Sequence, residues 1–419
     1  MKIDKTSLRT TTGLSVLSNI ENIVIKLVGF KSYQLYLDFS DTILLDAQNP
    51  KDSIAQLFKN QQNTPLIFSG LIGFFSYDIL ANHAGVNCQA RKDVDSPDGI
   101  FSRPSTIISI KNDKVEIESL IPNRCQQLKE LCDGHRGFEN KQSNHSSSLE
   151  CNIAFKEYQK IFAEAQAEII NGNTYQIKIS QRFKSQQHGN GISLFERLMD
   201  KNPAPESFYY RWGDFSMISC SPETVIHTVG KTLITKPIGG TYKKDHSNCS
   251  KENYLHFFAK DEKEVSEHNM IVDLERNDLS RICNTGTVNI TKFREIEEYE
   301  HLYHLVTTIE GQIKDSTNGQ DIIKSMLPGG SITGCPKIKT MQLIDRLEPC
   351  ARGAYTGSFG TIADNGDMHF NLIIRTIMSL HDKFYIQAGG GIVMDSTAAY
   401  EYQENLTKAK SLIEVLQSS

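Results

Sequence analysis

Apolar and polar residues alternate over short stretches in the first third of the chain. Four stretches have this pattern over strand-like lengths: YQLYLDF (33–39), TILLDA (42–47), STIISI (105–110) and KVEIESL (114–120). Side chains of a strand point alternately to its two faces, so this alternation predicts half-buried strands. We therefore expect residues 1–150 to form an N-terminal, sheet-rich subdomain.

A polar stretch separates this part from the remainder. Residues 134–152, GHRGFENKQSNHSSSLECN, are rich in Ser and Asn and almost lack apolar periodicity, which is typical of a linker. Beyond it, TYQIKISQRF (174–183) alternates like a strand, and helical spacing predicts helices over 155–171, 261–280 and 398–416. Strands and helices mixed in both parts predict an α+β fold, with residues 151–419 as its second region.

Charge and composition narrow the class of protein. The chain has 45 Lys and Arg against 50 Asp and Glu, a formal net charge of −5, so a nucleic-acid binder with a basic footprint is not expected. The nine cysteines form no C-x-x-C pair, which favours separate reduced thiols over a zinc site or a disulfide framework. The most apolar stretch, residues 66–75, is too short to span a bilayer, and the N-terminus lacks a signal-peptide core. We expect a soluble, cytoplasmic protein without a membrane partner.

Two predicted helices each carry a pair of glutamates three residues apart. Glu264 and Glu267 share one helix face, as do Glu401 and Glu404, with Lys408 one turn further. Converging carboxylates of this kind suit Mg²⁺, which takes oxygen ligands and often bridges to an anionic substrate. The alternative is an ordinary solvated helix face with an i,i+4 salt bridge.

Glycine is concentrated in four segments: PIGGT (237–241), LPGGSITGCPK (327–337), YTGSFG (355–360) and QAGGGIV (387–393). Successive backbone amides in such turns can form a nest for a carboxylate or phosphate. Arg375 lies in a mainly apolar run between the last two segments, and a buried arginine needs an anionic partner. Together they favour a small polyanionic ligand. Ordinary hairpins, helix caps and a structural ion pair are the alternatives.

These segments, in this order, resemble the chorismate-utilising enzymes. The resemblance rests on SCSPETV (219–225), KPIGGTY (236–242), EHNMIVDLERND (267–278), PGGSITGCPK (328–337), QAGGGIV (387–393) and EYQENLTKA (401–409), and covers about residues 155 to 415. GLIGFFSYD (70–78) extends it into the N-terminal part. The resemblance implies a fold in which two sheet-rich subdomains pack around a central cleft.

The resemblance also implies roles for individual residues. Glu223 matches the general acid that protonates the leaving C4 hydroxyl of chorismate, which requires a raised pKa. Mg²⁺, holding the ring carboxylate, would be surrounded by Glu264, Glu267, Glu401 and Glu404. The enolpyruvyl carboxylate would be gripped by Tyr355, Arg375, Gly389 and Gly391. Further substrate-side positions are Thr241, His304, Ser331 and Lys408.

Gln176 indicates the nucleophile. Family members that add water carry a lysine base at this position, and the ammonia-using members carry glutamine. The chain has no G-x-C-x-G nucleophile elbow of a glutaminase. The resemblance thus implies ammonia delivered by a separate glutamine amidotransferase subunit.

The motifs divide between the two ammonia-using branches of the family. G-S-I-T-G and NPAP (202–205) favour component I of aminodeoxychorismate synthase, on the folate path. Many members of that branch carry a nucleophilic lysine where this chain has Gly239, so Gly239→Lys is expected to raise C4 amination if the missing nucleophile limits the rate. Anthranilate synthase component I is the alternative, and a non-catalytic subunit with this fold is a second one. Pro205, Glu206 and Ser207 match part of the family's tryptophan pocket.

Overall fold

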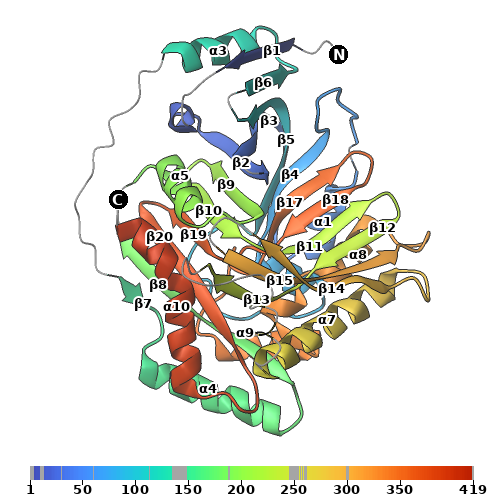
Figure 1. Ribbon diagram of the computed structural model, residues 1–419, viewed down its shortest axis with the longest axis vertical. Helices are drawn as coiled ribbons and strands as arrows, with labels where there is room; N and C mark the ends of the chain where they lie inside the picture. Colours follow the sequence, from blue (N-terminus) through green and yellow to red (C-terminus); the bar gives the residue numbers. More distant parts are fainter. Residues whose placement is uncertain are drawn as a thin grey trace.

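The computed structural model describes most of the chain. The described residues are 4–9, 14–29, 31–59, 61–112, 114–134, 149–186, 189–244, 254, 256, 258, 262–298 and 302–417. Residues 135–148 of the predicted linker lie outside these ranges. Helices and strands are mixed along the chain (Figure 1), which confirms the predicted α+β class.

The described strands join through antiparallel pairs into one branched sheet with two arms. The first arm runs in the order β8 (Gln176–Gln186), β20 (Lys383–Ile392), β19 (Thr376–Leu380), β10 (Phe215–Ser221), β9 (Glu206–Trp212), β2 (Asn22–Gly29) and β3 (Ser32–Leu44). The second runs β4 (Gly70–Phe75), β17 (Ser358–Ala363), β18 (Met368–Asn371), β11 (Thr224–Val229), β12 (Thr232–Lys236) and β15 (Leu302–Gln312).

The long strand β5 (Gly99–Lys111) joins the arms, because it pairs with both β3 and β4. Short strands complete the ends: β6 (Lys114–Ser119) and β1 (Asp4–Arg9) extend β5, β7 (Glu150–Cys151) and β16 (Gly334–Cys335) flank β8, and β13 (Ile238–Lys243) and β14 (Asn289–Glu298) flank β15. Strands from both sides of residue 150 thus pair with each other, and the predicted division there stays a prediction.

The two arms face each other across an aromatic core. Phe208 of β9 stacks on Phe359 of β17 with ring centroids 3.9 Å apart, and Phe74 of β4 stacks on Phe215 of β10. Neighbouring residues on these strands, such as Tyr209, point instead into a second apolar cluster beneath the helices. Both faces of the strands are therefore buried, and the arms form two layers with a core between them.

Helices cover the outer faces of both layers (Figure 1). The first arm is covered by α5 (Gly191–Lys201), α10 (Ala398–Gln417) and α3 (Arg124–Gly134), with the 3₁₀ turn Leu14–Leu17. The second is covered by α1 (Pro50–Gln56), α2 (Tyr77–His83), α7 (Glu262–Ile282) and α8 (Gly319–Met326). A further cluster joins α4 (Phe155–Ile170) and α9 (Lys337–Leu347) to β8; a second 3₁₀ turn spans Gly330–Ile332. The helices predicted over 155–171, 261–280 and 398–416 correspond to α4, α7 and α10.

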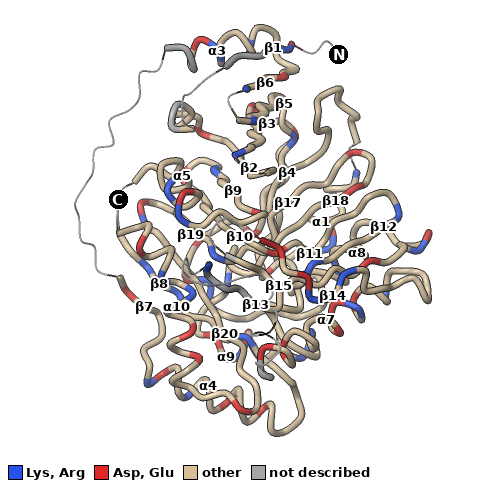
Figure 2. The backbone as a smooth tube through the Cα atoms, in the orientation of Figure 1, with Lys and Arg blue, Asp and Glu red and all other residues tan. Residues whose placement is uncertain are grey.

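Charged residues of both signs are interspersed along the chain (Figure 2), without a continuous basic stripe among the described residues. No helix in the described ranges is both long and apolar enough to cross a membrane. The described cysteines, including the exposed Cys151, are free thiols.

Candidate active site

One cavity of about 500 Å³ gathers most of the predicted site residues from separate helices, strands and turns. The predicted residues that line it are Glu223, Gly239, Glu264, Glu267, Ser331, Tyr355, Arg375, Gly389, Glu404 and Lys408. Helices α7 and α10, which lie more than 100 residues apart in sequence, supply its glutamates. The structure thus brings these ten positions together in one cavity, and the roles expected for them stay predictions.

Glu223 lies in the turn between β10 and β11 and is buried. Its Oε1 accepts a hydrogen bond of 2.6 Å from the Ser331 hydroxyl. Burial raises the pKa of the Glu223 carboxyl to about 7, although the Ser331 hydrogen bond pulls the other way. The carboxyl group is therefore poised to hold and release a proton near neutral pH.

Arg375 and the glycine-containing strand β20 also line the cavity. Arg375 lies just before β19 with a φ of 50°, and its carbonyl accepts a hydrogen bond from the Cys220 amide. Burial lowers the pKa of Arg375, but a guanidinium stays charged at neutral pH. On β20, a Cβ atom at Gly389 would lie 3.1 Å from the Tyr355 hydroxyl oxygen. A side chain at position 389 would therefore crowd Tyr355 in this wall of the cavity.

His304, Gln176 and Gly391 lie next to the cavity without lining it. His304 is buried on β15, and burial together with the charge of Arg375 lowers its pKa to about 3, so its ring is neutral. The backbone of Thr241 pairs with His304 across β13 and β15, but the side chain of Thr241 lies outside the described residues. A Cβ atom at Gly391 would meet the Gln176 amide at 2.5 Å.

The glutamate pair of α7 is tied to strand β8. Glu267 Oε1 accepts hydrogen bonds from Lys178 Nζ at 2.7 Å and from Gln176 Nε2 at 2.8 Å. Burial alone would raise the pKa of Glu267, but the charge and hydrogen bond of Lys178 outweigh it and lower the pKa to about 2. Glu264, one turn earlier, is half-buried at the cavity wall. This pair is thus a negative site with an ammonium already beside it.

The glutamate pair of α10 forms an oxygen-lined hollow. Glu401 is fully buried and accepts a hydrogen bond from Ser396, and Glu404 forms a 2.7 Å salt bridge with Lys408. The position that a Cβ atom on Gly390 would occupy lies 2.8 Å from Glu401 Oε2, 3.2 Å from Glu404 Oε2 and 3.0 Å from the side-chain oxygen of Asn405. Three side-chain oxygens thus gather next to Gly390, and oxygen is the ligand type that a hard cation such as Mg²⁺ takes. Among the described residues, no three acidic, histidine or cysteine side chains by themselves enclose a metal position.

Two ionisable residues of the cavity lining were not predicted from the sequence. Lys178 carries the ammonium beside Glu267, and the ring of His268 packs against Gly239, with a Cβ atom at Gly239 only 2.5 Å from its Nδ1. Both could have been found locally: Lys178 follows Gln176 by two residues and so shares its strand face, and His268 directly follows Glu267.

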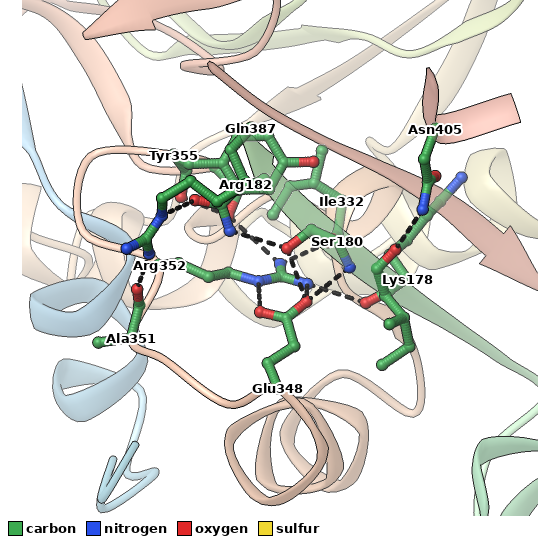
Figure 3. A network of polar contacts seen from close by, with 12 residues as sticks. Lys178, Ser180, Arg182, Ile332, Glu348, Ala351, Arg352, Tyr355, Gln387 and Asn405 are labelled. Atoms are coloured by element: carbon green, nitrogen blue, oxygen red, sulfur yellow. Dashed lines mark hydrogen bonds and ion pairs between the residues drawn. The ribbon is translucent and has the colours of Figure 1, made fainter. Parts of the chain in front are cut away.

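A buried ion-pair network supports the strand that carries Lys178 (Figure 3). Arg352 forms two hydrogen bonds with Glu348 and donates a third, of 2.8 Å, to the Lys178 carbonyl. Glu348 in turn accepts hydrogen bonds from the backbone and side chain of Ser180. Asn405 of α10 donates to the next carbonyl, that of Ile179. The network fixes β8 between α9 and α10.

The residues predicted for a tryptophan pocket lie elsewhere. Pro205 and Glu206 line a second cavity of about 530 Å³, together with Lys26 and His369. Glu206 is buried, and burial is outweighed by its pairing with His369 and Lys26, so its pKa falls to about 2. Ser207 does not line this cavity; its hydroxyl bonds the Ala204 carbonyl. Tryptophan binding stays a prediction.

Comparison with known proteins places this geometry in a family context. The sequence profile of chorismate binding enzymes matches residues 23–414. The chain is 39% identical over 251 residues to aminodeoxychorismate synthase component 1 of Bacillus subtilis (strain 168), covering 60% of this chain and 53%, about half, of that protein. It is 30% identical over 362 residues to anthranilate synthase component 1 of Thermus thermophilus, covering 84% of this chain and 78% of that protein.

Two solved structures share the architecture. Anthranilate synthase component I from Streptococcus pneumoniae TIGR4 superposes with a TM-score of 0.75 at 27% identity, covering 98% of this chain and 92% of that one. The menaquinone-specific isochorismate synthase MenF from Escherichia coli superposes with a TM-score of 0.76 at 16% identity, covering 99% and 95%, and supports the fold alone.

Proposed function

Because the chain belongs to the family of chorismate binding enzymes, we propose that it is component I of an aminodeoxychorismate synthase and aminates chorismate to 4-amino-4-deoxychorismate. One observation supports an acid-catalysed reaction on chorismate, which carries two carboxylates. Glu223, whose pKa burial raises to about 7, faces a cavity that also presents Arg375 and Lys408. Such an acid can protonate a leaving hydroxyl while the cations hold the carboxylates.

The choice of ammonia as nucleophile rests on Gln176. Its amide donates a hydrogen bond to Glu267, and a glutamine amide does not accept a proton from water as a lysine amine would. Ammonia needs no such base, because it is already a nucleophile when neutral. The relatives with 39% and 30% identity are named component 1, which supports a second subunit that supplies ammonia from glutamine.

Mg²⁺ is the cofactor that the glutamates would hold. Glu401 and Glu404 both place an oxygen near Gly390, and Glu404 lines the same cavity as Glu264 and Glu267 of α7. When bound, the ion would supply positive charge to the ring carboxylate of the substrate. The protein's own part is to orient the substrate between Arg375 and this charge and to deliver the proton from Glu223.

Anthranilate synthase component I is the second candidate, and the contact between Gly239 and His268 favours it. Without a side chain at 239, no lysine there can attack C2 of chorismate, and the His268 ring fills the space where such a chain would begin. Direct attack of ammonia at C2 would lead toward anthranilate. Glu223, the glutamate pairs and Arg375 all remain in place, which speaks against a non-catalytic subunit.

The product decides between the candidates. The protein is incubated with chorismate, Mg²⁺ and ammonium, with and without an added aminodeoxychorismate lyase. Appearance of 4-aminobenzoate only with the lyase is the expected result. Anthranilate fluorescence that needs no lyase would replace the first candidate with the second, and an unchanged chorismate pool would refute both.

A further inference from the structure

We propose that Lys178 is a built-in counter-cation of the glutamate cluster, whose ammonium competes with a divalent cation for Glu267, so that this cavity takes up the metal chiefly together with an anionic substrate. The inference rests on the proposed function only in assigning the glutamates to a metal. The inference itself concerns Lys178 and the dependence of divalent-cation binding on the anionic substrate.

The position of the ammonium carries the inference. Lys178 Nζ lies 2.7 Å from Glu267 Oε1, and the Lys178 side chain is only 14% exposed. Its Nζ also lies 3.0 Å from the position of a Cβ atom on Gly391, so the side chain runs alongside strand β20. Lys178, Glu264 and Glu404 line the same cavity. The ammonium thus stands between the glutamates of α7 and those of α10.

The ammonium is held there by a rigid backbone. Arg352 donates to the Lys178 carbonyl at 2.8 Å, and Asn405 donates to the Ile179 carbonyl at 3.3 Å (Figure 3). Arg352 is itself anchored by a buried salt bridge of 2.8 Å to Glu348. Strand β8 therefore holds the backbone of Lys178 at a fixed place, and only its flexible side chain can move.

Each glutamate pair has one ammonium of its own. Lys178 pairs with Glu267 of α7, and Lys408 pairs with Glu404 of α10 at 2.7 Å. The two ammoniums differ in their surroundings, because the Lys408 side chain is 42% exposed and can turn toward solvent. Lys178 is enclosed, so a second cation beside Glu267 would stay within a few ångströms of it. Like charges at that separation in a partly buried site repel strongly.

A dianionic substrate changes this balance. Its carboxylates add the negative charge that allows the ammonium and a divalent cation to share the cavity. Metal and substrate are then expected to strengthen each other's binding, since a coupling between two ligands is reciprocal. Without the ammonium, the metal is expected to bind the glutamates in the absence of substrate.

The test measures binding of Mg²⁺ alone to the full chain by titration calorimetry. In Lys178→Gln the charge is lost while an amide can still bond Glu267, and we expect Mg²⁺ to bind at least about tenfold more tightly than to the unchanged protein. Lys178→Arg keeps a cation and is expected to bind Mg²⁺ as weakly as the unchanged protein. Lys236→Met is the matched control, because Lys236 pairs with Glu297 and does not line the cavity.

Unchanged or weaker Mg²⁺ binding in Lys178→Gln overturns the inference. Should that variant fold poorly, the melting temperature of Lys178→Met is measured in Mg²⁺ and in chelator. If Mg²⁺ raises this melting temperature more than it raises that of the unchanged protein, competition is supported. An equal rise in the two proteins overturns it. The product assay is separate. Tighter Mg²⁺ binding in Lys178→Gln, without any amination by the unchanged protein, would support the inference and refute the proposed function. Amination by the unchanged protein, with no tighter Mg²⁺ binding in the variant, would support the proposed function and overturn the inference.

Discussion

The Glu223 carboxyl group shows how burial and one hydrogen bond set the chemistry of a single residue. A fully exposed glutamate would be ionised at neutral pH and would have no proton to give. In the turn after β10, burial raises the pKa of Glu223 to about 7, and the Ser331 hydroxyl moderates the rise by favouring the carboxylate. The acid can then donate a proton near pH 7.

Replacing this acid is expected to cost most of the turnover. Glu223→Gln keeps the shape and can still bond Ser331, but it carries no acidic proton. General acid catalysis is typically worth about 10²–10⁴-fold, so turnover should fall by that order. Chorismate binding, measured by calorimetry, should be largely retained, because Arg375 and Lys408 are untouched. Normal turnover would place the proton donor elsewhere.

The pH profile is the second prediction at this scale. Since the acid must be protonated, turnover is expected to fall as pH rises through about 7, the pKa of Glu223. A second buried acid could give the same pH profile: Glu275 accepts a hydrogen bond from the Gly330 amide, and burial raises the pKa of Glu275 as well. Ser331→Ala identifies the group, because loss of its hydrogen bond should move the Glu223 pKa, and with it the falling limb, to higher pH. An unmoved limb would assign it to another acid.

Gly239 and His268 should behave as a coupled pair. A Cβ atom on Gly239 would lie 2.5 Å from the His268 ring, closer than real side chains approach, and overpacking typically costs about 1–3 kcal/mol. Gly239→Ala is therefore expected to lower the free energy of unfolding, and adding His268→Ala should recover part of the loss. A double-mutant cycle in denaturant measures the coupling. Additive effects would contradict it.

The same contact revises the expectation for a lysine at 239. The sequence suggested that Gly239→Lys alone could supply a missing nucleophile. With the His268 ring in the way, the lysine needs His268→Ala beside it to reach into the cavity. The contact joins a residue of β13 to a residue of α7, which belong to different elements, so the periodicity within either element does not predict it.

At the scale of elements, the three helices that the sequence predicted lie where they were expected, because the signal of a helix is local. The expected 155–171, 261–280 and 398–416 became Phe155–Ile170, Glu262–Ile282 and Ala398–Gln417. The i,i+3 spacing also placed the glutamate pairs on shared faces. The strand face that Lys178 shares with Gln176 could be predicted locally, but not its contact with Glu267, because that contact joins β8 to α7, 89 residues away.

Metal dependence is the prediction that belongs to α7 and α10. Chelation is expected to abolish amination, and Mg²⁺ should restore it. Glu404→Gln should weaken Mg²⁺ and chorismate binding together, because the ion would bridge them. Glu414→Gln is the matched control on α10, since Glu414 makes only a surface pair with Lys410 at 4.0 Å. Full activity in excess chelator would remove the metal from the site.

At the scale of the whole molecule, sequence reasoning predicted the α+β class but not how the strands are joined. Residues 70–78 were assigned to the N-terminal part, yet β4 pairs along its length with β17, some 290 residues later. Likewise β2 pairs with β9. Alternating patterns indicate that a strand has a buried face, but they carry no information about its partner, which long-range packing selects.

The cysteines of the chain bear on the proposed need for a separate source of ammonia. A glutaminase needs a thiolate, and thiols become nucleophilic when a base or a cation lowers their pKa. Burial instead raises the pKa of every described cysteine for which a shift is seen: Cys88, Cys125, Cys220, Cys283, Cys335 and Cys350. The sequence also lacks a G-x-C-x-G elbow. These six thiols are therefore unsuited to releasing ammonia from glutamine.

The isolated chain is accordingly expected to aminate chorismate with ammonium and not with glutamine. Adding the cognate amidotransferase subunit should confer glutamine use, because its thiolate releases the ammonia that this cavity consumes. The measurement follows product formation with each nitrogen source, at a pH where some ammonia is neutral. A partner whose nucleophilic cysteine is replaced by alanine is the control, and it should leave ammonium-dependent activity intact while conferring no use of glutamine. Glutamine-dependent product from the pure single chain would contradict a separate subunit and place a glutaminase within these 419 residues.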